Sequence, residues 1–220
     1  MSTTPLLSVE GLSHRFDTNA THFAVRDASF EVQAGEVLAI VGESGSGKST
    51  LLNCLAGRIA PTQGRVHYLA ASGQRVDVHA APERLRRELA RTEWGFGEQH
   101  AHEGLRMGVS AGANIGERLM GQGERHYELL RDTALRWMQR VELEAGRIDD
   151  LPRHFSGGMR QRLQIARNLV TRPRLVLMDE PTSGLDVSVQ ARLLDLIRLL
   201  VSRLQLSVVI VTHDLGVARL

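Results

Sequence analysis

Apolar and polar positions alternate in short runs over the first 35 residues of the chain. Leu7 and Val9 form one such pair, and Phe30 and Val32 form another. Successive side chains of a β-strand point to opposite faces of a sheet, so this period of two is typical of half-buried strands. The pattern predicts a small β-rich layer that ends at Gly35.

The rest of the chain alternates strand-like and helical stretches. Compact apolar runs predict strands, and apolar positions three or four residues apart predict helices. We expect strands at 36–41, 64–69, 92–97, 175–178 and 207–211. We expect helices from about residue 48 and at 83–91, 128–141, 159–170 and 187–204. This alternation is typical of an α/β fold with a doubly wound parallel sheet, and the polar helical stretch suggests an inserted helical subdomain at about 100–170.

Composition narrows the class of protein. The chain has 220 residues, of which 42% are hydrophobic and 24% are charged, so it is neither disordered nor collagen-like. Cys54 is the single cysteine, which excludes a disulfide framework and fits a reducing compartment. Residues 1–7 do not read as a signal peptide, and no 18 apolar residues run together. We therefore expect a cytoplasmic protein without a membrane span of its own.

The basic residues are almost all arginine. Lysine and arginine together number 27, and Lys48 is the one lysine, which leaves 26 arginines. The net charge is only +2, so the arginine content indicates a compositional bias and not a nucleic-acid-binding surface.

Residues 42–49 fit the pattern G-x-x-x-x-G-K-[ST], between a predicted strand and a predicted helix. Glycines let backbone N–H groups curl around phosphate oxygens, and the helix N-terminus adds partial positive charge. Lysine would reach the β- and γ-phosphates of a nucleotide, and serine would ligate Mg²⁺. An ordinary glycine turn is the alternative. The candidate nucleotide-binding residues are Gly42, Ser44, Gly45, Gly47, Lys48, Ser49 and Thr50.

Two acids, Asp179 and Glu180, follow the apolar strand at 175–178. They would lie at the carboxyl edge of the sheet beside residues 42–49, where ligands bind in such folds. Asp179 would hold Mg²⁺ through water, and Glu180 would polarise the attacking water. Helix capping is the alternative role for such a pair.

The segment Phe155-Ser-Gly-Gly-Met159, together with these acids and with residues 183–186, resembles the ABC-type ATPases over essentially the whole chain. The resemblance implies a P-loop NTPase of ABC type, in which residues 1–220 form a single nucleotide-binding domain with ATP and Mg²⁺ as cofactors. It also implies that Ser156, Gly157 and Gly158 contact ATP held by the opposite subunit of a homodimer. A helix N-terminus with a hydroxyl group is an anion site, although Ser156 could also be a plain N-cap.

Four further roles follow only from the resemblance. Gln99 would be the lid glutamine that senses Mg²⁺ and water, and His213 the switch histidine that hydrogen-bonds the γ-phosphate. Phe16 would stack on adenine, and Asp186 would lie in a loop that links the two sites of the dimer. The alternative for Phe16 is a core position in the β-rich layer.

The chain departs from the family pattern in two places. Met159 stands where glutamine is commoner, which removes any contact of that glutamine, although the Ser-Gly-Gly core is retained. The sequence also ends a few residues after His213, whereas family members continue through further strands and a helix. We therefore expect the C-terminal part of the domain to be truncated.

Residues 91–95, 110–120, 147–152 and 186–192 resemble the subgroup that serves the bacterial carbon–phosphorus lyase system for phosphonate breakdown. The implied partner is the soluble lyase core complex, which would supply the bond cleavage, because this chain has no cysteine cluster for an iron–sulfur centre. The alternatives are the ATPase subunit of a dipeptide or oligopeptide importer and a nucleotide-gated module with negligible hydrolysis. A DNA-repair ATPase is disfavoured, because no coiled-coil or zinc-binding insertion interrupts the motifs.

Overall fold

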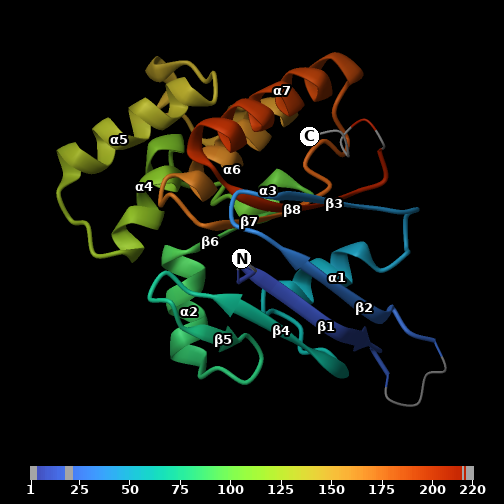
Figure 1. The fold of residues 1–220 in the computed structure, drawn as a ribbon. Helices are drawn as coiled ribbons and strands as arrows, with labels where there is room; N and C mark the ends of the chain where they lie inside the picture. The colour runs from blue at the N-terminus through green and yellow to red at the C-terminus, as the bar shows by residue number, and fades with distance from the viewer. Residues whose placement is uncertain (1–3, 18–21, 215, 217–220) are drawn as a thin grey trace.

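The structure, a computed structural model, describes residues 4–17, 22–214 and 216, and contains two four-stranded sheets (Figure 1). The antiparallel sheet has the order β2-β1-β4-β5 and consists of β1 (Leu7–His14), β2 (Val25–Val32), β4 (Gln63–Leu69) and β5 (Arg75–Asp77). The parallel sheet has the order β3-β8-β7-β6 and consists of β3 (Val37–Val41), β6 (Trp94–Gly97), β7 (Leu175–Asp179) and β8 (Ser207–Thr212).

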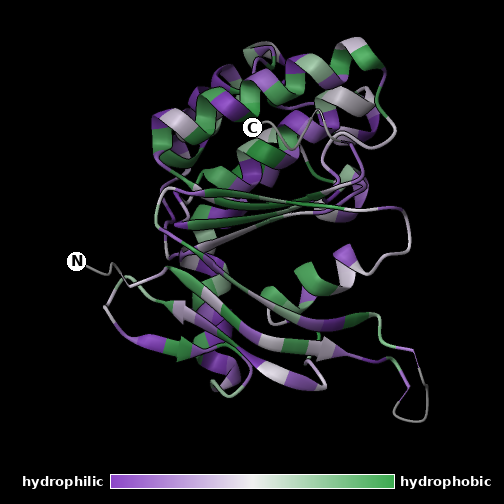
Figure 2. Ribbon diagram, turned by 45° about the vertical axis from the view of Figure 1, so that its right-hand side comes forward, coloured by the Kyte–Doolittle hydropathy of each residue, from purple (hydrophilic) through white to green (hydrophobic). Residues whose placement is uncertain are grey.

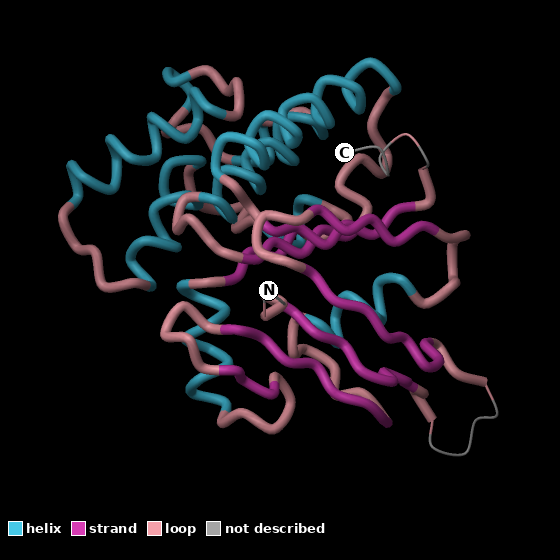
Figure 3. The backbone as a smooth tube through the Cα atoms, viewed as in Figure 1, coloured by secondary structure: helices cyan, strands magenta, loops and turns pink. Residues whose placement is uncertain are grey.

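The helices divide between the two faces of the parallel sheet (Figure 3). One face is covered by α3 (Ala101–Gly104), α4 (Ala111–Gly121), α5 (Tyr127–Arg140), α6 (Gly157–Leu169) and α7 (Val187–Leu204). The short 3₁₀ turns η1 (Ala145–Arg147) and η2 (Pro152–His154) connect α5 to α6. On the other face, α1 (Lys48–Leu55) lies between the two sheets and α2 (Glu83–Thr92) packs below β6.

The central strands β7 and β8 are buried on both faces (Figure 2). Val176 and Ile210 belong to the apolar cluster formed with α6 and α7, whereas Leu177 and Val211 belong to the cluster formed with α1 and the antiparallel sheet. This separation follows from the alternation of side chains along a strand. A strand that is covered on both faces reads as a continuous apolar run, which is why these two were predictable.

The expected fold class is confirmed: a parallel sheet forms the core, and the N-terminal β-strands lie in an antiparallel layer. The strand predicted at 64–69 joins the antiparallel layer, where Val66 pairs with Val9. The strand predicted from residue 92 was wrong at its start, because Thr92 is the last residue of α2 and β6 begins at Trp94. The strand β5 was not predicted, because three residues are too short for a periodic pattern.

The stretch of about 100–170, predicted to be a helical subdomain, contains α3 to α6 and both 3₁₀ turns. Its limits, and the extent of a single domain over 1–220, stay predictions. Over the described residues, no helix combines the length and the apolar character needed to cross a bilayer.

Candidate functional site

The loop between β3 and α1 has a backbone that only glycine allows at one position. Gly47 has a φ of 89°, and a Cβ atom there would lie 1.9 Å from the carbonyl oxygen of Ala24. Gly45 also has a positive φ, of 80°. Both angles belong to the left-handed region that side chains disfavour. The loop therefore curls tightly before α1 begins at Lys48.

The ammonium group of Lys48 is held inside this loop. Lys48 is 7% exposed, and its Nζ donates hydrogen bonds to the carbonyl oxygens of Gly42 at 2.8 Å and Glu43 at 2.7 Å. Nζ also lies 3.7 Å from Oε1 of Glu180. The one lysine of the chain is thus fixed between the loop and the acid that follows β7.

A second contact, between Ser49 and Asp179, joins the start of α1 to the end of β7. The Ser49 hydroxyl donates to Oδ1 of Asp179 at 3.0 Å. Burial raises the pKa of the Asp179 carboxyl, while the hydrogen bond from Ser49 opposes the rise. The pair forms because β3 and β7 are both parallel partners of β8, so their carboxyl ends reach the same edge of the sheet.

Three side chains approach the carboxylate of Glu180. Lys48 approaches Oε1, whereas Nδ1 of His213 lies 3.1 Å from Oε2 and Nε2 of Gln99 donates to Oε2 at 3.3 Å. Glu180 is not a glycine, yet its φ is 38°, in the left-handed region. Such backbone conformations gather at functional sites, where the surrounding structure holds them in place.

Neither acid caps a described helix, so the capping alternative is wrong. Asp179 ends β7, Glu180 follows it, and the N-cap residue of α7 is Asp186.

Two adjoining cavities border these side chains and share Ser44, Gln99 and Glu180. The first, of about 220 Å³, is also lined by Phe16, Ala24, Gly45, Gly47, Lys48, Ser49 and Thr50. The second, of about 690 Å³, is also lined by Val41, Gly42, Glu43, Ser183 and His213. The structure therefore brings together every predicted residue of the loop with Glu180, Gln99 and His213.

Phe16 lies at the rim of the smaller cavity. Phe16 is 75% exposed, and its ring lies at 87° to the His14 ring at a centroid distance of 4.9 Å. The core alternative for Phe16 is therefore wrong, because the residue is exposed and lines the cavity beside the glycine loop.

Besides Asp179, which reaches the loop through its hydrogen bond with Ser49, four predicted residues line neither cavity. Ser156 is exposed at the N-terminus of α6, where its hydroxyl accepts a hydrogen bond from the Met159 N–H at 3.3 Å. Gly157 and Gly158 follow it, and a Cβ at Gly158 would lie 2.5 Å from a methyl group of Val189. Asp186 is likewise exposed. Within one subunit, none of these four residues lines a cavity beside the glycine loop.

Two side chains that the sequence did not predict, Ser183 and Gln190, form hydrogen bonds with residues at or next to the site. Ser183 accepts a hydrogen bond from Gln99 Nε2 at 3.4 Å, and it belongs to the 183–186 segment that pointed to the family. Gln190 on α7 donates to Asp214 at 2.6 Å, which anchors the residue next to His213. Gln190 belongs to the 186–192 segment that resembles the subgroup, but its contact was not predicted, because its partner is 24 residues away in the sequence.

The donor set around Ser49 and Asp179 fits Mg²⁺. A hydroxyl and a carboxylate are hard oxygen ligands, and Mg²⁺ binds through one or two such groups plus water and substrate phosphates. In residues 4–17, 22–214 and 216 there is no cluster of three or more His, Cys, Asp or Glu side chains that could hold a metal. The hydroxyl of Ser49 and the carboxylate of Asp179 are two oxygen ligands, which fits a Mg²⁺ ion whose other ligands are water and phosphate oxygens.

Comparison with known proteins agrees with this geometry. The family model described as ABC transporter matches residues 25–183, which include the glycine loop, the signature segment and both acids. The chain belongs to the ABC transporter ATP-binding family. The fold and the glycine loop described above are therefore those of an ABC cassette.

Curated ABC relatives align with nearly the whole chain. It is 61% identical over 216 residues to the phosphonates utilization ATP-binding protein PhnK of Escherichia coli (strain K12), covering 98% of this chain and 82% of that protein. It is 38% identical over 218 residues to a peptide import ATP-binding protein of Brucella ovis, covering 99% of this chain and 67% of that protein.

Solved ABC cassettes share the fold. A dimeric post-hydrolysis state of an ATP-binding cassette with bound ADP and Pi matches with a TM-score of 0.84 and 28% identity, over 97% of this chain and 90% of that chain. A dimeric structure of a bacterial ABC transporter cassette matches with a TM-score of 0.85 and 29% identity over the same shares of the two chains.

Proposed function

We propose that this ABC cassette is a Mg²⁺-dependent ATPase that converts ATP and water to ADP and phosphate. The observation that supports it most directly is the approach of Lys48, Gln99 and His213 to the carboxylate of Glu180 beside the glycine loop. A cation, an amide donor and an imidazole around one carboxylate can bind a phosphate and orient a water molecule.

The glycine loop would bind the phosphates. Backbone N–H groups of this loop would donate to the oxygens of a triphosphate, and Lys48 would supply the positive charge. In the structure Lys48 Nζ contacts two carbonyl oxygens and lies near Glu180. Its ammonium group therefore lies inside the loop, between the P-loop backbone and the acid that would act on water. The Phe16 ring would stack on the adenine at the rim of the cavity.

Glu180 would orient and polarise the attacking water. Gln99 and His213 both approach Oε2, and His213 would hydrogen-bond the γ-phosphate. Bound Mg²⁺ would neutralise charge that develops on the phosphate oxygens. Ser49 and Asp179 would hold that ion, and Gln99 would complete its surroundings.

The active form would be a homodimer that closes on two ATP molecules. Ser156, Gly157 and Gly158 line neither cavity of their own subunit, and Ser156 is exposed at a helix N-terminus. A partner's γ-phosphate is a ligand that this hydroxyl and these N–H groups suit. Two solved cassettes with the same fold are dimeric, one of them with ADP and Pi. Asp186 would lie between the two sites.

The partner would be a carbon–phosphorus lyase core complex in the cytoplasm. The basis is the 61% identity with the phosphonates utilization protein against 38% with the peptide import protein. The second candidate is the ATPase subunit of a peptide-type importer, which would associate with a permease in the membrane.

Two measurements test these proposals. Phosphate release from ATP by the purified protein, with and without Mg²⁺, tests the ATPase. Purification of tagged protein from phosphate-starved cells tests the partner. A detergent-free complex with lyase subunits is expected, and association only with a detergent-solubilised permease would support the importer instead.

A further inference from the structure

On the edge of β6 that faces away from β7, side chains donate hydrogen bonds to the backbone carbonyl oxygens of the strand. β6 is the last strand of the parallel sheet, and β7 is its one strand partner among the described residues. Asn168 Nδ2 donates to the carbonyl oxygen of Phe96 at 2.8 Å, and Arg118 Nη2 donates to that of Trp94 at 2.8 Å. Gln161 Nε2 then donates to the carbonyl oxygen of Gln99 at 3.0 Å. Helix α6 thus holds the strand and the lid glutamine that follows it.

Three amides on α6 form one face, which we call the amide face: Gln161, Gln164 and Asn168. They are spaced at i, i+3 and i+7, so they lie on the same side of the helix. All three are buried, with Gln161 4% exposed and Gln164 3% exposed. Gln164 packs against Gly104, where a Cβ would lie 2.5 Å from its Nε2, and that Nε2 has no hydrogen-bond partner among the described residues.

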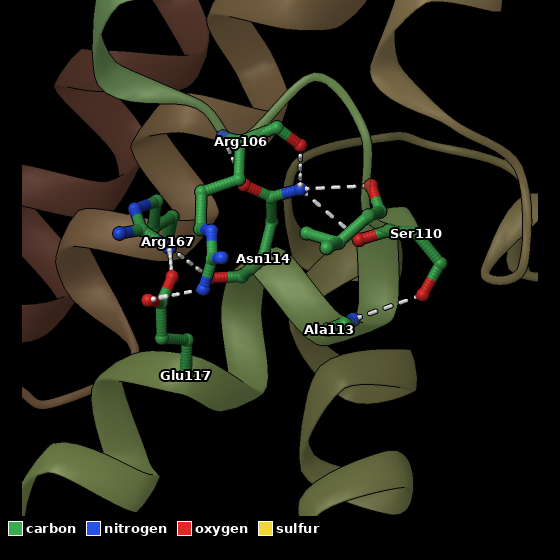
Figure 4. Close-up of polar contacts among 7 residues, drawn as sticks. Arg106, Ser110, Ala113, Asn114, Glu117 and Arg167 are labelled. Carbon is green, nitrogen blue, oxygen red and sulfur yellow. Dashed lines mark hydrogen bonds and ion pairs between the residues drawn. The ribbon is translucent and has the colours of Figure 1, made fainter.

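Another residue of α6, Arg167, forms hydrogen bonds with α4 (Figure 4). Arg167 Nη1 donates to the carbonyl oxygen of Asn114 and to Oε2 of Glu117, both at 2.7 Å. Arg106 Nη1 donates to the other oxygen of Glu117 at 3.1 Å. The two arginines and the shared carboxylate connect α6, α4 and the segment before α4. A shift of α4 is therefore expected to move α6 with it.

We propose that Gln161 is a positioning residue that couples α6 to the lid glutamine. The proposal rests on the proposed ATPase function. Ser156, which would contact the partner's ATP, lies at the start of α6, and Gln161 lies five residues later, or about 7.5 Å along the axis. When α6 is displaced at its N-terminus, Gln161 moves the Gln99 main chain. The Gln99 amide, which touches Glu180 Oε2, then moves relative to the attacking water.

A matched pair of substitutions tests the coupling. Gln161→Met and Gln164→Met make the same chemical change on the same helix face at nearly equal burial. Only the first removes a hydrogen bond to Gln99. We expect Gln161→Met to lower kcat about tenfold, with unchanged affinity for ATP, because one buried hydrogen bond that holds the lid is lost. We expect Gln164→Met to keep the wild-type kcat.

A second readout does not need activity. Amide hydrogen exchange over residues 98–103 should be faster in Gln161→Met than in the wild type and unchanged in Gln164→Met. If Gln161→Met does not fold, Gln161→Asn and Gln164→Asn give the same comparison, because the shorter amide cannot reach the Gln99 oxygen.

Equal kcat values in the two variants, together with equal exchange over 98–103, would overturn the coupling. So would an equal loss in both variants with a matching fall in melting temperature, which would assign a purely structural role to the amide face. A wild-type protein that releases no phosphate from ATP would instead overturn the proposed function. In that case hydrogen exchange alone decides whether Gln161 holds Gln99.

Discussion

Lys48 Nζ lies 3.7 Å from Oε1 of Glu180, so the one lysine of the chain and the acid after β7 form an ion pair. Both side chains are largely buried, which strengthens their attraction relative to a surface pair. A triphosphate that enters the glycine loop would compete with Glu180 for the ammonium. Nucleotide binding and the placement of the acid are therefore expected to be linked.

Substitution of Lys48 tests the phosphate contact. We expect Lys48→Ala to weaken binding of a fluorescent ATP analogue at least about 10- to 100-fold, the equivalent of one charge-assisted hydrogen bond. Lys48→Arg should also bind poorly, because a planar guanidinium cannot replace a compact ammonium among the carbonyl oxygens of Gly42 and Glu43. Wild-type affinity in Lys48→Arg would show that charge alone is sufficient.

Asp179→Asn is expected to have opposite effects on the stability of the folded protein and on its Mg²⁺-dependent turnover. Burial raises the pKa of Asp179 in the folded state, so the folded protein binds a proton more tightly than the unfolded chain. Stability contributed by this group is therefore greatest at low pH and falls as pH rises through the folded pKa. The neutral Asn avoids the free-energy cost of burying an ionised carboxylate, so the nucleotide-free variant should melt a few degrees higher at pH 7. Each kcal/mol gained in the free energy of unfolding raises the melting temperature of a chain of this size by about 2–4 °C.

The same variant should need more Mg²⁺ for half-maximal phosphate release, because it loses the anionic ligand. Differential scanning fluorimetry from pH 4 to 8, with a Mg²⁺ titration of turnover, checks both parts. A lower melting temperature at pH 7 would contradict the assignment of a buried, costly carboxylate.

Gly47→Ala tests the tight turn of the glycine loop. A Cβ at this position would lie 1.9 Å from the Ala24 carbonyl oxygen, at a φ of 89°. Gly73→Ala is the matched control, because Gly73 has a φ of 83° but nothing within 4 Å of an added Cβ. Both variants should lose about 1 kcal/mol through backbone strain. Only Gly47→Ala should also lose ATP binding, measured with the same fluorescent analogue.

Ser156→Arg tests contact between subunits. Because Ser156 would act on the ATP of the partner, a heterodimer of wild-type and Ser156→Arg subunits should have impaired closure at a shared interface. Phosphate release from mixtures should therefore fall below the activity-weighted average of the two proteins. A linear dependence on the wild-type fraction would contradict action in the opposite subunit.

The features of the fold that the sequence predicts are local, whereas those that it does not predict join residues far apart in the sequence. The buried runs of β7 and β8 and the motif at 42–49 are local, so the sequence predicts both the parallel core and the glycine loop. The pairing of Val9 with Val66 joins residues 57 positions apart, which no local period encodes.

The site shows the same division. Glu180 and His213 were predicted by motif and resemblance, and the structure places their side chains 3.1 Å apart. The contacts of Gln161 with Gln99 and of Gln190 with Asp214 were missed, because their partners are 62 and 24 residues away in the sequence. Whether the predicted residues act on ATP stays a prediction that the experiments above decide.

The most direct test of the proposed chemistry is the rate of phosphate release by Glu180→Gln at saturating ATP, with the amount of bound ATP measured directly. Gln keeps the size of the side chain and removes the charge that would polarise water. We expect ATP affinity at or above that of the wild type, a longer-lived closed dimer, and turnover about 10²- to 10⁴-fold slower. Wild-type turnover in Glu180→Gln would contradict the assignment of Glu180 as the residue that activates water.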